Sequence, residues 1–268
     1  TLYDGTPVGG IFHFALIQQV LEICEKHGMK PEVQEIFAAD NRDSKRPGVS
    51  VLPAVEANFG EGAIQAHLLR RVYANIALRI DETEEFVTNL CVAYHQRGIQ
   101  LAVGPQVKIC HNQCIMHPSD VVSNYGDERV DIDGLLLKVE RWMNSYAKLS
   151  QCWQSCVEKM QDYAFGQVDG WQLVGMLVDE RVRHDSRLKQ EHRPDCYPLN
   201  NTQINRMAEL MFVRRKEMNV YEEPPRTLWD AYNLCTAELH PDKTDIPAVI
   251  PQQLALIQCM KRMLRNKQ

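Results

Sequence analysis

The segment 71–80 places the tightest limit on the fold, because its polarity alternates residue by residue. One set of alternating positions is apolar: Val72, Ala74, Ile76, Leu78 and Ile80. The other set is mostly polar: Arg71, Tyr73, Asn75, Ala77 and Arg79. A period of two residues is typical of a β-strand with one buried face and one solvated face. The sequence therefore predicts an amphipathic strand here, with its second face in contact with water.

Short apolar segments separated by turn residues follow this strand. Three of them have strand character: 86–94, 99–103 and 107–110. The predicted turns between them are His95–Gly98 and Gly104-Pro105. Turns this short join antiparallel neighbours. Earlier in the chain we predict strands at 31–39 and 49–55, after a helix that starts at Thr6-Pro7 and ends at His27-Gly28. The first half therefore reads as a leading helix and an antiparallel β meander.

From Ile132 onward the apolar residues recur with helical spacing instead. The predicted helices cover 132 to beyond 160, the segment from 168, 201–211, the segment from 228, and 251–264. Polar residues between Arg187 and Pro198 predict a loop. The pattern predicts an α+β fold, with a strand-rich α+β region at 1–130 and a helical region at 131–268 packed on it.

Composition and charge limit the cellular environment and the partners that we expect for the chain. No apolar run approaches the roughly 20 residues of a membrane span, so we expect no membrane insertion. Nine cysteines, an odd number scattered over 268 residues, favour free thiols in a reducing cytoplasm over a disulfide scaffold. The net charge is −5, and the acidic excess falls within residues 1–130. The chain therefore lacks the overall basic surplus that a non-specific DNA-binding protein usually carries.

Two thiols and two imidazoles lie close together in one segment: Cys110, His111, Cys114 and His117. Thiolate and imidazole are the ligands that zinc prefers, and a structural zinc site needs four ligands. Cys152 and Cys156 repeat the spacing of Cys110 and Cys114 on a predicted helix, where they share one face. The segment is a candidate zinc site or cysteine-based active site. The alternative is that these cysteines are small buried apolar residues and that no cofactor is bound.

Basic and aromatic residues gather on the second face of the 71–80 strand and in the turns beside it. They are Arg71, Tyr73, Arg79, Arg97 and Lys108. A basic sheet surface with an aromatic side chain is one way in which proteins bind single-stranded nucleic acid. A second basic group, Lys261, Arg262, Arg265 and Lys267, closes the last predicted helix, where we interpret it as cations that complement the helix dipole.

Common catalytic signatures are absent from the sequence. It contains no Gly-x-Ser-x-Gly, no phosphate-binding Gly-x4-Gly-Lys-Ser/Thr, no Gly-x-Gly-x-x-Gly and no His-Glu-x-x-His. These absences remove the usual hydrolase, nucleotide-binding, dinucleotide-binding and zinc-protease interpretations. They favour a binding protein over an enzyme and leave an unfamiliar enzyme open.

The region of the meander resembles the phage/plasmid-like proteins of unknown function, which are encoded on prophages, plasmids and conjugative elements of bacteria. The resemblance is carried by the turn His95–Gly98 and by a second strand with Lys108 before Cys110 and Asn112. The segments 197–204 and 228–236 resemble Bacteroides-type members of the same family. The resemblance implies a mobile-element protein in a bacterial cytoplasm, with His95 and Asn112 added to the candidate binding residues.

Three functions are compatible with these observations. The first is a non-catalytic protein that binds DNA, including single-stranded DNA, or a host protein, in recombination, replication or counter-defence. The second is a metal- or cysteine-dependent enzyme centred on Cys110, His111, Cys114 and His117. The third is a structural component of a virion. Self-association stays open under all three.

Overall fold

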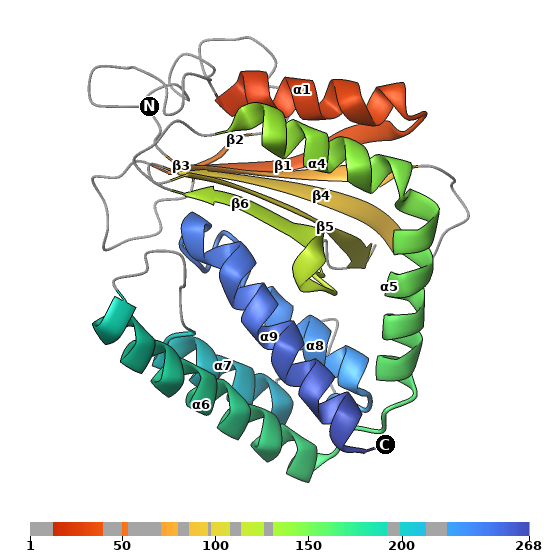
Figure 1. Ribbon diagram of the computed structural model, residues 1–268. Coiled ribbons are helices and arrows are strands. Elements are labelled where there is room, and N and C mark those ends of the chain that lie inside the picture. The colour runs from red at the N-terminus through yellow and green to blue at the C-terminus, as the bar shows by residue number, and fades with distance from the viewer. Residues whose placement is uncertain are drawn as a thin grey trace.

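The computed structural model contains a six-stranded antiparallel sheet that is covered by helices on both faces (Figure 1). It describes residues 13–39, 50–52, 71–79, 86–95, 98–107, 114–125, 131–191, 199–212 and 224–267. The strands are β1 (Lys30–Ala39), β2 (Ser50–Leu52), β3 (Arg71–Arg79), β4 (Phe86–His95), β5 (Gly98–Val107) and β6 (Val121–Tyr125), in the order β2-β1-β3-β4-β5-β6. The predicted α+β fold is confirmed, with the antiparallel meander after a leading helix and the later helices in the second half.

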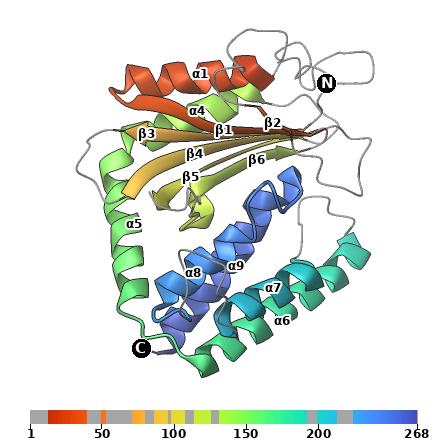
Figure 2. The same cartoon turned by 180° about the vertical axis from the view of Figure 1, so that it is seen from behind.

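The helices form layers on either side of the sheet (Figures 1 and 2). Helices α1 (His13–Lys26) and α4 (Ile132–Asn144) cover one face. Helices α8 (Leu228–Ala237) and α9 (Ile246–Asn266) lie on the other side, with α6 (Gln167–Glu191) and α7 (Asn201–Phe212) outside them. Helix α5 (Tyr146–Gln161) runs along one side of the molecule, past α8 and α9. None of the described helices is long and apolar enough to cross a membrane.

One cluster of buried side chains joins the strand-rich and helical regions. It includes Leu16 of α1, Val92 of β4, Leu135 of α4 and Leu256 of α9, each at most 2% exposed. Because these side chains come from both sequence regions, the sheet and the later helices share a core.

The second face of β3 is buried, so the prediction that it contacts water is wrong. Tyr73, Asn75 and Ala77 are at most 2% exposed. Tyr73 belongs to a buried cluster with Ile250 and other α9 residues. Two pairs of polar side chains contact each other on this face of the sheet: the Tyr73 hydroxyl lies 2.8 Å from Cys91 Sγ, and Asn89 Nδ2 donates to Gln106 Oε1 at 3.0 Å. A buried face with paired polar groups has the same alternation as a solvated face.

The predicted turn at Gly104-Pro105 is also wrong, because β5 continues through both residues to Val107. A Cβ on Gly104 would collide with the carbonyl oxygen of Cys114. The amide of Cys114 donates to the carbonyl of Pro105 at 2.9 Å. The glycine therefore permits a close approach of two backbone segments and does not mark a turn. The predicted strand at 107–110 lies, beyond Val107, outside the described residues, and β6 is a strand that the sequence pattern did not predict.

Two helix boundaries are where the local signals predicted them. Gly28 has a φ of 78° and ends α1, as a C-terminal glycine should. The capping box of α8 is present, with Thr227 Oγ1 accepting from the Asp230 amide and the Asp230 carboxylate accepting from the Thr227 amide. The first turns of the leading helix, before residue 13, lie outside the described residues.

Three helix predictions need correction. The helix predicted from Ile132 past Met160 is two helices that meet at Ser145. Helix α6 continues to Glu191, into the predicted polar loop. The last helix starts at Ile246 and contains Pro251 in its interior. Proline removes one helical hydrogen bond, and burial of Val249 and Ile250 against the sheet offsets that loss.

A bulge in β1 allows a side chain of this strand to contact the segment between α8 and α9. The register shifts between Val33, which pairs with Ile76, and Glu35, which pairs with Asn75. The shift turns the Glu35 side chain towards α9's side of the sheet, where its Oε2 lies 3.2 Å from His240 Nε2. The other ring nitrogen of His240 lies 2.7 Å from the Asp242 carboxylate. Burial alone would lower the pKa of His240, but these two carboxylates hold it above its ordinary value.

We predict that this contact makes stability depend on pH. Because the folded pKa of His240 is raised, its contribution is fully present below the ordinary value of 6.5 and is lost as the pH rises through the folded pKa. Urea unfolding at about pH 5.5 and about pH 8.5 measures the free energy of unfolding of the natural chain and of His240→Gln. The natural chain should be the more stable at the lower pH, and the difference should be smaller at the higher pH. Glu35→Gln, which keeps a polar side chain but removes its charge, should weaken the same dependence. An advantage that grows with pH would contradict the assignment.

Candidate anion-binding groove

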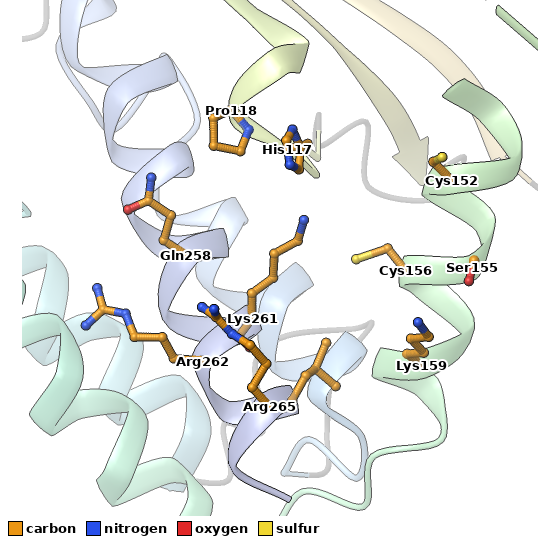
Figure 3. Close-up of a pocket in the computed structure, with 11 residues that line it drawn as sticks. His117, Pro118, Cys152, Ser155, Cys156, Lys159, Gln258, Lys261, Arg262 and Arg265 are labelled. Carbon is orange, nitrogen blue, oxygen red and sulfur yellow. The ribbon is translucent and has the colours of Figure 1, made fainter. Parts of the chain in front are cut away.

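A groove with a volume of about 620 Å³ lies between α5 and α9 (Figure 3). Each helix contributes residues at the spacing i, i+3, i+4 and i+7: Cys152, Ser155, Cys156 and Lys159 from α5, and Gln258, Lys261, Arg262 and Arg265 from α9. This spacing puts all four residues of each set on one helix face. Lys261 points from α9 into the space between the helices, whereas Arg262 points away from α5, and His117 and Pro118 close one end of the groove.

The lining of the groove is basic. Lys159 comes from α5, Lys261 and Arg262 are adjacent residues of α9, and Arg265 lies one turn further along that helix. None of the residues described as lining the groove is Asp or Glu. The single cation of α5 and the cations of α9 therefore border one space that water or an anion can enter.

The cations of the groove differ in how they are paired. Arg262 Nη2 donates to Glu180 of α6 at 2.8 Å, and this hydrogen bond raises the pKa of the guanidinium. Lys159 and Lys261 make no ion pair with any described residue, and Arg265 Nε donates only to the carbonyl of Lys261, at 3.3 Å. The buried carboxylate of Asp120 lies near Lys261 and offsets part of the repulsion among these cations, and a bound anion would relieve more of it.

The buried side chain of Asp120 holds the end of the groove in place through hydrogen bonds. Its side chain is 1% exposed, and its Oδ2 accepts from Trp153 Nε1 at 3.0 Å and from the His117 amide at 2.8 Å. Burial raises the pKa of this carboxyl, and its two donors and Lys261 oppose the rise. The hydrogen bond to Trp153 ties the turn Pro118–Asp120 to α5, so it fixes His117 at the mouth of the groove.

The predicted zinc ligands are not brought together among the described residues. Cys114 is fully buried, and its Sγ lies 3.7 Å from Asn233 Oδ1. His117 is exposed, and its Nδ1 lies 2.8 Å from Ser119 Oγ. Cys110 and His111 fall outside the described residues. No group of three or more His, Cys, Asp or Glu in the described part of the chain could hold a metal ion.

The predicted nucleic-acid residues do not form an exposed sheet surface where the structure describes them. Tyr73 is buried, so it cannot stack on a base, and its assignment is corrected. Arg79 is exposed but pairs with Glu32 at 2.7 Å. Arg71 and His95 lie in β3 and β4, and their side chains are not described. Arg97, Lys108 and Asn112 are outside the described residues.

The sequence contains the basic residues of the groove but does not predict that they line a common site. On the sequence alone, Lys261, Arg262 and Arg265 are cations at a helix end, and no sequence motif distinguishes Lys159 from other surface lysines. A polar stripe at i, i+3, i+4 and i+7 on both helices is the signal that could have identified them. What the sequence does not contain is the adjacency of α5 and α9, whose residues 159 and 261 are far apart in the chain.

Comparison with known proteins gives no relative from which a function could be transferred. No protein-family model matches the chain, and neither the curated proteins nor the solved structures contain a match. The resemblance to phage/plasmid-like proteins therefore stays a prediction, and any function must be argued from the groove itself.

Proposed function

We propose that this protein is a non-catalytic mobile-element protein that binds single-stranded nucleic acid through its phosphates, in the groove between α5 and α9. The observation that carries the proposal is the set of cations without ion pairs, Lys159, Lys261 and Arg265, on the two helices that border the groove. The mobile-element setting is what the resemblance of the meander implies.

Electrostatics supports a polyanion as the ligand. The chain as a whole has a net charge of −5, so a basic groove stands out against an acidic background. Phosphates that contact Lys and Arg displace their condensed counterions, and this release drives binding at low salt. A basic cleft also concentrates field lines and attracts anions from a distance.

The size and lining of the groove favour one strand. A volume of about 620 Å³ falls in the range of ordinary ligand pockets, so it suits a short piece of a single strand better than a duplex. The described lining contains no Phe, Tyr or Trp, and its one aromatic ring is the imidazole of His117 at the end of the groove, so contact is expected with phosphates more than with bases. The proposed binding therefore has little preference for base sequence.

Lysine footprinting tests this proposal. The full chain is acetylated with and without a single-stranded oligonucleotide, and the modified lysines are located by mass spectrometry. Lys159 and Lys261 should become protected, because their ammonium groups contact phosphates. Lys148 is an internal control: it is exposed and lies on the same helix as Lys159, but it does not line the groove. Equal modification of Lys159 and Lys261 with and without a bound oligonucleotide would rule the groove out as its site.

A further inference from the structure

The groove contains thiols as well as cations. Cys152 is exposed and Cys156, one turn further along α5, is half-buried. In Figure 3 the Cys156 side chain points from α5 into the space between the two helices. The remaining described cysteines are fully buried: Cys24, Cys91, Cys114, Cys235 and Cys259. Within the described part of the chain, a solute can therefore reach only the two thiols of the groove.

The surroundings of Cys156 differ from those of the core cysteines. The pKa of its thiol is raised, mainly by burial and also by Asp120, whereas Lys261 and Lys159, one from each helix, act in the opposite direction. The fully buried thiol of Cys235 has neighbouring Glu238, which adds to the effect of burial and raises its pKa further. A partly exposed cysteine among cations is the setting in which thiols react, and an apolar buried one is inert.

We propose that Cys156 is a modification site for small anionic disulfides, compounds in which each half of the disulfide carries a carboxylate. The carboxylates contact Lys159, Lys261 and Arg265, and this contact holds the disulfide beside the Cys156 sulfur. The volume of the groove is in the range of pockets for small molecules. The inference goes beyond nucleic-acid binding, because it requires only the cations and the thiol.

The reaction is a thiol–disulfide exchange. Cys156 loses its proton to solvent, and the thiolate sulfur attacks one sulfur of the bound disulfide. A new disulfide bond forms between Cys156 and that half of the reagent, while the original sulfur–sulfur bond breaks. The other half leaves as a thiolate with the electron pair of the broken bond. The reagent is thus the oxidant, and a second thiol from solution reverses the step.

The cations explain why Cys156 is selected and not the more exposed Cys152. Exposure governs the reaction with an uncharged disulfide, and it favours Cys152. An anionic disulfide is attracted to the cations first, and Lys159 and Lys261 act directly on the Cys156 thiol. The choice of cysteine should therefore depend on the charge of the reagent.

The test compares two aromatic disulfides on the folded 268-residue chain: dithiobis(nitrobenzoate), which carries a carboxylate on each half, and dithiodipyridine, which is uncharged. Mass spectrometry of the peptides assigns each rate constant to a cysteine. At Cys156, the ratio of the anionic to the neutral rate constant should exceed its value in urea-unfolded protein by about tenfold or more. The excess should decrease as salt is raised.

Variants test whether the cations of the groove cause the raised ratio of anionic to neutral rate constants at Cys156. Lys159→Gln combined with Lys261→Gln should lower it most of the way to the unfolded value, with Arg265 supplying the remainder, whereas Lys148→Gln should leave it unchanged. Labelling of Cys152 in preference to Cys156 by the anionic reagent, or a ratio equal to that of unfolded protein, would overturn the proposal. Because no nucleic acid is present, this result and the footprinting result are independent, and either proposal can fail alone.

Discussion

Replacing Trp153 with alanine is expected to lower the free energy of unfolding by about 3–5 kcal/mol. The Trp153 side chain is 4% exposed and packs edge-to-face on Tyr146, with ring centroids 6.5 Å apart. Its Nε1 donates to the buried carboxylate of Asp120. Truncation therefore leaves a cavity in the core and removes a hydrogen bond from a buried charge, and these costs add.

Trp171 offers a matched control for this prediction. Its side chain is 58% exposed and stacks on Phe212, with ring centroids 4.3 Å apart. Trp171→Ala should cost only about 1 kcal/mol, mainly from the lost ring contact. Urea unfolding followed by circular dichroism measures both variants without relying on tryptophan fluorescence. Equal losses for the two variants would show that α5 is not anchored to Asp120 as described.

Reversing two charges in the groove is expected to abolish most nucleic-acid affinity. Lys261→Glu with Arg265→Glu replaces two cations on one face of α9 by carboxylates, which repel the phosphates that the cations would bind. At about 50 mM salt we expect the affinity for a single-stranded oligonucleotide to fall by about a hundredfold or more. Fluorescence anisotropy of a labelled oligonucleotide gives the dissociation constants.

The control for charge reversal carries the same change in net charge elsewhere. Lys30→Glu with Lys148→Glu alters two exposed lysines outside the groove and should change affinity by much less. Because Lys261 lies near the buried Asp120, the milder pair Lys261→Gln with Arg265→Gln is needed as well. It should lower affinity by about tenfold with an unchanged circular dichroism spectrum. Similar losses in the control and the groove variant would point to bulk charge and against the groove.

The sequence predicted those features of the fold that depend on neighbouring residues. The strand at 71–80 and the cap of α8 were predicted because a period of two and a Thr-x-x-Asp box are local signals. The α+β class followed from the change of period at Ile132. These predictions needed no knowledge of which elements pack together.

The failures share one cause, which is contact between distant segments. Tyr73 reads as solvated until α9 is placed over its face of the sheet. Gly104 reads as a turn until the backbone of Cys114 is found against it. No role for Lys159 can be predicted from the sequence, because its place in the groove depends on α9, which brings Lys261 to the same groove. Local polarity reports that a residue is polar, whereas tertiary packing determines whether its partner is water, protein or ligand.

The most direct test of the proposed function is the salt dependence of single-stranded nucleic-acid binding by the natural chain. For single strands, the slope of log K against log salt is about −0.7 for each phosphate contacted, so three to four cations in the groove predict a slope of about −2 to −3. The slope should approach about −1 when Lys261 and Arg265 are both replaced by glutamine. A slope near zero in the natural chain, or one that these substitutions leave unchanged, would contradict binding in this groove.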